Sequence, residues 1–351
     1  MIVVALYFLL RPLPLLPSET FLSPDADAFL ILQISPEDEC FVAVLQELAK
    51  RPPAEVKLAE QQREQLLTQP EQIRQVLLQM LPMRLVVLAR HVERKAKQDE
   101  EGFTFSGVMS IRGLSGFGGF ILRLIRGSMV EQGGRLEKYK GVKIGVSSTG
   151  LHLAKLGNNF MFAPDAETIA RWVDRIREQE RLMKSAAEGE GPVLPYEGPG
   201  VLGDVLGALE RRAQLRCASV NSHDEVSAFL EAAGPEGGMF QKITVALLDS
   251  GIASAQVIAV GATARLVEPD AADFELLFRA DDERFAGELR DRLVDLLESA
   301  AADIGIEGIR GTADGSLVRV TFRKARLRDA LRGAVEQFRR ASGRAPASSQ
   351  R

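Results

Sequence analysis

Strand-like apolar runs alternate with amphipathic helical patterns along this chain, and this repeated pattern limits the folds that the chain can adopt. Five segments show an apolar run, a short polar link and then a helical apolar face. They read LILQISPEDECFVAVLQEL, NFMFAPDAETIARWVDRI, RCASVNSHDEVSAFLEAA, ELLFRADDERFAGELRDRL and VRVTFRKARLRDALRGAV. Three of them share one distance between the last strand residue and the first helix residue: Ile34 and Phe41, Phe162 and Ile169, Phe278 and Phe285. The pattern predicts strands with helices packed on them.

A period of two dominates the stretch from Arg84 to Ala163. Apolar residues alternate there with polar ones, and Gly150 and Gly157 stand at turn positions between the runs. Short turns join antiparallel neighbours, so the stretch predicts a meander. The fold class expected is therefore α+β, with two similar halves, each a twisted antiparallel sheet that has helices packed on one face.

The domain plan follows from length and from one change in composition. A chain of 351 residues favours two domains. Residues 186–200 combine glycine, proline and acidic residues, which is typical of a linker. We therefore expect a first half over 17–185, a second half over 201–341 and a disordered tail over 342–351.

The first residues, MIVVALYFLL, are all apolar and are followed by RPLPLLP. The run is shorter than the roughly 20 residues that cross a bilayer, and it lacks the basic leader of a signal peptide. Two interpretations stay open: residues 1–16 are the end of a truncated membrane anchor, with its linker, whose start lies before Met1, or they hold a buried first strand. The prolines favour the anchor. The expected location is then the cell envelope, facing the periplasm or the exterior, with the cytoplasm as the alternative.

Net charge and cysteine content narrow the classes of partner. A net charge of −4 and a pI near 5.7 give no general reason to expect nucleic acid as a partner. The two cysteines, Cys40 and Cys217, are too few for a zinc cluster or a disulfide framework. We interpret both as small buried thiols, with a single disulfide between them left open. Neither a cofactor nor a metal is expected, and the oligomeric state stays open.

A glycine-rich stretch, SIRGLSGFGGFILRLIRG, has the glycine spacing of a phosphate-binding loop. Gly113, Gly116 and Gly119 follow a strand and precede an apolar run, and Tyr139 and Lys143 have the Y-x-x-x-K spacing of short-chain dehydrogenases. A dinucleotide site needs a parallel βαβ unit, whereas the strand before these glycines alternates like an antiparallel one. We therefore interpret the three glycines as a tight turn and keep them as weak cofactor-binding candidates.

The histidines and acidic clusters have structural explanations. His91, His152 and His223 are far apart, and none has a second ligand at helical spacing. Asp165 and Glu167, like the group Asp281 to Glu283, stand where helices begin, where carboxylates cap the first turn and suit the helix dipole. No catalytic or metal-binding residue is predicted.

The recurring strand and helix units, with the opening LPSETFLSPDADAFLILQIS behind an apolar run and a proline-rich spacer, support a resemblance. The chain resembles uncharacterised bacterial envelope proteins of the domain-of-unknown-function type. That resemblance implies an N-terminal anchor followed by an α+β ectodomain, and it assigns no functional residues.

These observations favour a non-enzymatic, membrane-tethered scaffold or binding module whose partner is not defined by the sequence. An alternative is a carrier that holds an apolar ligand or lipid between sheet and helices. The apolar strand residues expected to line such a site are Phe103, Phe105, Met109, Phe160 and Phe162. A third hypothesis is a nucleotide-binding enzyme centred on Gly113, Gly116 and Gly119.

Overall fold

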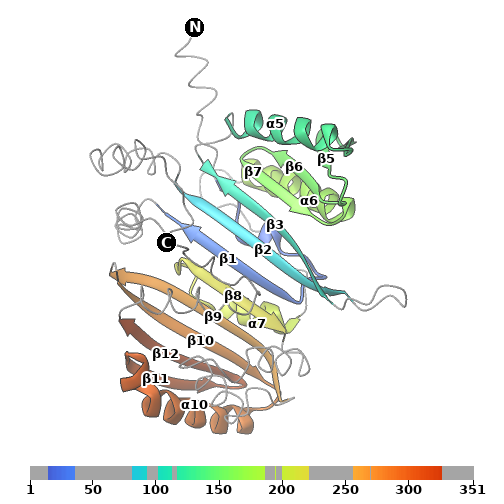
Figure 1. The fold of residues 1–351 in the computed structure, drawn as a ribbon. Coiled ribbons are helices and arrows are strands. Elements are labelled where there is room, and N and C mark those ends of the chain that lie inside the picture. Colours follow the sequence, from blue (N-terminus) through green and yellow to red (C-terminus); the bar gives the residue numbers. More distant parts are fainter. Residues whose placement is uncertain are drawn as a thin grey trace, which may run out of the picture. The chain divides into compact units, whose positions relative to one another are not determined.

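The chain forms two compact units, Met1–Gly203 (unit 1) and Asp204–Arg351 (unit 2), and each is described by itself. A computed structural model describes residues 15–35, 81–92, 102–112, 117–185, 194, 200–220, 256–268 and 270–325 (Figure 1). The strand pairings described within each unit are antiparallel. An α+β fold built on antiparallel sheet is therefore confirmed.

The described residues of unit 1 form seven neighbouring strands, in the order β1-β2-β3-β7-β6-β5-β4. Its elements are η1 (Ser18–Phe21), β1 (Ala28–Ile34), β2 (Met83–Val92), β3 (Gly102–Ile111), α5 (Phe117–Glu131), β4 (Arg135–Tyr139), β5 (Val142–Val146), β6 (His152–Leu156), β7 (Asn159–Ala163) and α6 (Ala166–Ser185). The meander predicted from Arg84 to Ala163 is confirmed only in part, because helix α5 interrupts it between β3 and β4. The strands β4 to β7 do form a meander, and its last strand returns to pair with β3, Gly107 opposite Phe162.

Helix α6 covers one face of this sheet and holds the N-terminal segment. Its residues Ile169, Trp172 and Ile176 are fully buried, in agreement with the spacing seen in the sequence. The Trp172 indole Nε1–H donates to the carbonyl oxygen of Phe21 at 2.8 Å, and the Arg175 Nε–H donates to that of Thr20 at 3.0 Å. These bonds attach η1 to α6 by its backbone.

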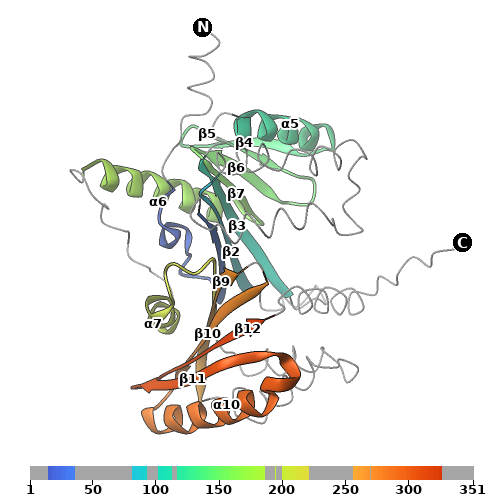
Figure 2. The ribbon, with the colours of Figure 1, turned by 90° about the vertical axis from the view of Figure 1, so that its left-hand side faces the viewer.

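Helix α5 lies on the opposite face of the same sheet. A Cβ added at Gly145 in β5 would lie 2.6 Å from the Cγ of Arg126, whereas Tyr139, on the other face, bonds to Asp174 of α6 at 2.8 Å. Figure 2 shows the two helices on the two sides of strands β4 to β7. The prediction that helices pack on one face only is therefore wrong for unit 1.

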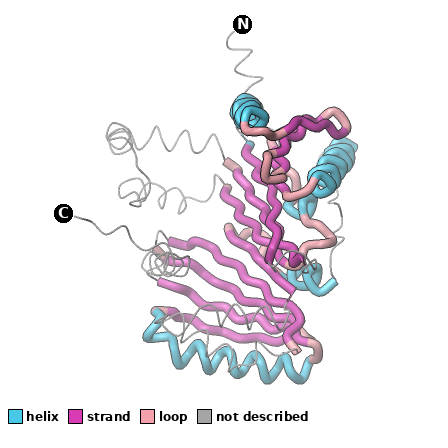
Figure 3. The backbone as a smooth tube through the Cα atoms, turned by 45° about the vertical axis from the view of Figure 1, so that its right-hand side comes forward, coloured by secondary structure: helices cyan, strands magenta, loops and turns pink. Residues whose placement is uncertain are grey.

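In unit 2, the part of the chain that the structure describes has five strands, in the order β11-β12-β10-β9-β8. Its elements are α7 (Gly200–Ala208), which crosses the division between the units, β8 (Leu215–Val220), β9 (Val257–Glu268), β10 (Ala271–Ala280), α10 (Glu283–Ile304), β11 (Ile306–Asp314) and β12 (Leu317–Ala325). Figure 3 shows α10 running along the strands of this unit.

Helix α10 begins and ends at residues suited to those positions. The Asp282 carboxylate accepts a hydrogen bond from the backbone N–H of Phe285 at 2.7 Å, and Gly305, at φ 63°, ends the helix in the left-handed region. Phe285, Leu289 and Leu293 then form one core cluster with strand residues that include Phe278. The predicted spacing from Phe278 to Phe285 is that of a real strand, cap and helix.

The other face of the unit 2 sheet is covered in part by α7 and the residues after it. A Cβ at Gly261 would lie 2.5 Å from Val205 Cγ1 and 3.3 Å from Leu209 Cδ2. In β10, Leu277 and Phe278 are neighbours and both are buried, so each face needs its own cover. Packing on a single face is therefore wrong for unit 2 as well.

Several expectations fall outside the described residues. They include the N-terminal run up to residue 14, the helix that begins at Phe41, Cys40, the capping group around Ser222 and the tail over 342–351. Among the helices that are described, none is long and apolar enough to cross a bilayer.

Candidate functional site

A polar groove of about 660 Å³ lies on the face of the unit 2 sheet opposite α10. We call it the unit 2 groove. Its lining residues are Glu210, Thr263, Arg265, Asp273, Phe274, Glu275, Glu307, Gly308, Arg310, Arg319, Thr321, Phe322 and Arg323.

Strand register brings these charges together from four strands. Directly paired residues lie on the same face of a sheet, so pairing defines rows across the groove. One row is Arg265, Asp273, Arg323 and Glu307, and the next is Thr263, Glu275, Thr321 and Arg310. Charged and hydroxyl side chains therefore replace the apolar residues that cover the α10 face of the same strands.

A bulge in β11 directs Arg310 into the groove. Glu307 pairs with Arg323 and Arg310 with Thr321, so two residues of β11, Gly308 and Ile309, stand opposite a single residue of β12. Gly308 has φ 66°, a conformation that favours glycine. In a regular strand Arg310 would point away from Glu307, whereas the bulge puts both side chains on one face.

Glu275 is the buried charge of the groove, with a side chain that is 8% exposed. Its carboxylate pairs with Arg319 and accepts hydrogen bonds from Thr263 Oγ1 at 3.2 Å and from the Glu210 backbone N–H at 3.4 Å. Arg319 also donates to the carbonyl oxygen of Ala208 at 3.0 Å. A buried carboxylate needs such partners, and here they tie the end of α7 to the sheet.

Asp273 is held between two guanidinium groups. Arg323 Nε lies 2.8 Å from its carboxylate, and Arg265 lies 3.4 Å away. The hydrogen bond from Arg323, and then that from Arg265, lowers the pKa of Asp273 below its ordinary value. A carboxylate stabilised in its charged form is a weak proton acceptor, so this group suits charge organisation better than general base catalysis.

Arg310 differs from the other arginines of the groove. It is exposed, and among the described residues it makes neither an ion pair nor a side-chain hydrogen bond. Its guanidinium group therefore has a full set of donors available to a ligand. The group's flat fork matches a carboxylate or a phosphate in a bidentate contact.

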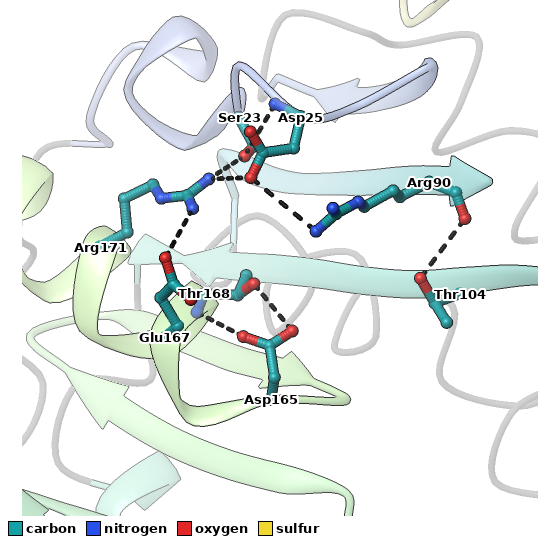
Figure 4. Close-up of polar contacts among 8 residues, drawn as sticks. All are labelled: Ser23, Asp25, Arg90, Thr104, Asp165, Glu167, Thr168 and Arg171. Atoms are coloured by element: carbon teal, nitrogen blue, oxygen red, sulfur yellow. Dashed lines mark hydrogen bonds and ion pairs between the residues drawn. The ribbon is translucent and has the colours of Figure 1, made fainter. Parts of the chain in front are cut away.

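In a second polar cluster, in unit 1, each charged side chain has an ion-pair or hydrogen-bond partner (Figure 4). Asp165 accepts from the Thr168 backbone N–H at 2.7 Å and so caps α6, while Arg171 donates to Asp25 at 2.9 Å. Glu167 lies 3.4 Å from Arg171. The cluster fastens the segment between η1 and β1 to α6, and the structural role expected for Asp165 is confirmed.

The glycine candidates are not brought into a nucleotide site by the described residues. Gly113 and Gly116 lie outside the described residues, and Gly119 lies in the first turn of α5. Strand β3 pairs antiparallel with both neighbours, unlike a dinucleotide-binding βαβ unit. Tyr139 and Lys143 point to opposite faces of β4 and β5, since Tyr139 pairs with Val142.

The histidines and the described cysteine lie apart from the groove. His152 is buried on β6, and no described residue bonds to its Nδ1. The side chain of His91 and the whole of His223 are outside the described residues. Cys217 is a free thiol on β8, and burial raises its pKa, which makes it a weak nucleophile.

Four of the predicted apolar-ligand residues share one face of unit 1. Met109 pairs with Phe160, and the ring of Phe162 lies over Gly107. Phe105 and Met109 are exposed, and the side chain of Phe103 is not among those described. The four form an open patch on β3 and β7.

No family model matches the chain, and neither a curated protein nor a solved structure matches it.

Proposed function

We propose that the protein is a non-enzymatic binding module whose unit 2 groove holds an acidic group of its partner, a carboxylate or a phosphate. The observation that carries the proposal is Arg310, an exposed and unpaired guanidinium that a glycine bulge turns into a groove. The other arginines of the groove are held by carboxylates, so they fix its shape while Arg310 supplies recognition.

The test is calorimetric titration with citrate and with pyrophosphate, two compact anions to which a guanidinium group can donate two hydrogen bonds. We expect Arg310→Ala to lose most of the binding seen with the unchanged protein, about tenfold or more, because a charge-assisted bidentate contact is lost. Arg284→Ala is the matched control, since Arg284 is an exposed arginine on α10. If Arg310→Ala binds citrate and pyrophosphate with the same affinity as the unchanged protein and the control, the groove is not the recognition site.

We further propose that the module is tethered at the cell envelope by its apolar N-terminus, as the sequence favours. Release of the protein from membranes by alkaline washing would contradict the tether. We also propose that the two units are one plan used twice, because β1-β2-β3-β7 and β8-β9-β10-β12 have matching orders and a helix follows β3 and β10 alike. An experimental structure with a different strand order in either unit would remove that relation.

The second candidate function is a carrier of an apolar ligand. The observation in its favour is the patch of Phe105, Met109, Phe160 and Phe162 on one face of unit 1. We expect solvent extraction of the purified protein, followed by mass spectrometry, to find lipid at near-equimolar amount if this is its role. Replacing Phe105 and Met109 by serine should then lower that amount, whereas lipid-free protein would exclude the role.

A further inference from the structure

We propose that unit 1 carries a membrane-binding surface, formed by α5 and strands β4 to β6, that recognises anionic lipid headgroups. We call it the α5 face. Its basic side chains are Arg123, Arg126, Lys138, Lys143 and Lys155. This role goes beyond that proposed for the unit 2 groove, which lies in the other unit.

Register and helix packing put these cations on one side of the sheet. Lys138 lies directly opposite Lys143, and two residues further along β5 Gly145 is in contact with Arg126 of α5. An Arg126 guanidinium N–H also donates to the carbonyl oxygen of Lys143 at 3.0 Å. Lys155 lies on the same face, two residues after the partner of Gly145, and Figure 2 shows α5 lying over these strands.

The cations of the α5 face repel one another, although Lys155 Nζ also donates to the carbonyl oxygen of Gly157. Burial and then the charge of Arg123 lower the pKa of Arg126, and burial and then the charge of Arg126 lower the pKa of Lys155. Lys138 and Lys143 are like charges directly opposite each other, an unfavourable cross-strand pair. Within the described part of the chain, no salt bridge joins Arg123, Arg126, Lys138 or Lys143 to a carboxylate. An external anion would relieve this repulsion.

Exposed aliphatic side chains stand among these charges. Leu136 is 57% exposed on the same face of β4, and Ile125, Val130 and Leu151 are exposed on α5 and before β6. Basic groups interleaved with exposed apolar groups favour a lipid surface, where the cations meet headgroups and the apolar side chains enter the acyl boundary. A nucleic acid would instead favour aromatic rings on which bases stack.

The test is sedimentation of the full chain with two kinds of vesicle, phosphatidylcholine alone and phosphatidylcholine with phosphatidylglycerol. A tether at the apolar N-terminus would act on both kinds of vesicle, so the difference between them reports recognition of the anionic headgroups, and the α5 variant below assigns that recognition to the α5 face. We expect stronger binding to the anionic vesicles, weakened by added salt. Arg123→Glu with Lys143→Glu should lower that preference by about tenfold or more.

The matched control reverses two exposed cations of α6, Arg181→Glu with Lys184→Glu, and should keep the preference. Fluorescence of Trp172 checks that both variants are folded. Equal binding to the two kinds of vesicle, or an unchanged preference in the α5 variant, overturns the proposal. A concentration-dependent dimer that the α5 variant abolishes, without vesicle binding, would assign the face to a second copy instead.

Discussion

Replacing Phe21 with alanine is expected to lower the free energy of unfolding of unit 1 by about 3–5 kcal/mol. Phe21 is fully buried in η1, and its carbonyl oxygen accepts the indole N–H of Trp172. Truncation of the ring leaves a cavity where η1 meets α6, and it loosens the backbone that Trp172 and Arg175 hold. A loss of this size is a large share of the stability of an ordinary domain.

Trp172 offers a direct measurement, because it is the one tryptophan of the chain. Urea unfolding followed by its fluorescence reports the region where η1 packs on α6. The control is Phe105→Ala, in the same unit, because Phe105 is 58% exposed and its loss should cost less than about 1 kcal/mol. Equal shifts of the two midpoints would show that η1 is not part of the core.

Helices with a regular apolar stripe and a cap could be predicted from sequence. In α6 the stripe from Ile169 to Ile176 is buried, and in α10 the stripe begins at Phe285 behind the cap Asp282. In both helices the cap and the apolar stripe favour the same structure as the tertiary packing, so the sequence pattern is sufficient to predict the helix.

Helix α5 and strand β11 could not be predicted in the same way. Two glycines, Gly118 and Gly119, stand near the start of α5, and its apolar run FILRLI has the β-branched and aromatic residues of a strand. Strand β11 contains Gly308 and Gly311, and the bulge between Glu307 and Arg310 breaks its alternation, so that its two isoleucines, Ile306 and Ile309, are three residues apart. Gly311 is required because a Cβ there would lie 2.5 Å from Val294 of α10, a contact that no local rule reveals.

The unit 2 groove was missed because it is assembled by register. Asp273 and Arg323 are 50 residues apart in the chain, yet they lie side by side. One signal was present: charged and hydroxyl residues alternate at 319, 321 and 323 and again at 273 and 275, which indicates a polar face on each strand. A glycine inside a strand pattern, at Gly308, also indicates a bulge.

Replacing Glu275 with alanine is expected to lower the free energy of unfolding of unit 2 by about 3 kcal/mol. The change removes the acceptor for Arg319, for the Thr263 hydroxyl and for the Glu210 backbone N–H. Loss of one partner from a buried ion pair leaves the other uncompensated. The expected loss lies at the low end of the range of about 3–5 kcal/mol for breaking a buried ion pair. The reason is that the Arg319 side chain is 41% exposed and stays in contact with water.

Thermal and urea unfolding followed by circular dichroism measure this loss, since Trp172 lies in unit 1. Glu307→Ala is the control, an exposed carboxylate in the same groove, and should change stability by less than about 0.5 kcal/mol. Glu275→Leu combined with Arg319→Met should recover much of the loss, because both members of the pair are then replaced by apolar groups. If Glu275→Ala costs no more than Glu307→Ala, the pair does not hold α7 to the sheet, and the groove around Arg310 is not the rigid site that recognition of an acidic ligand requires.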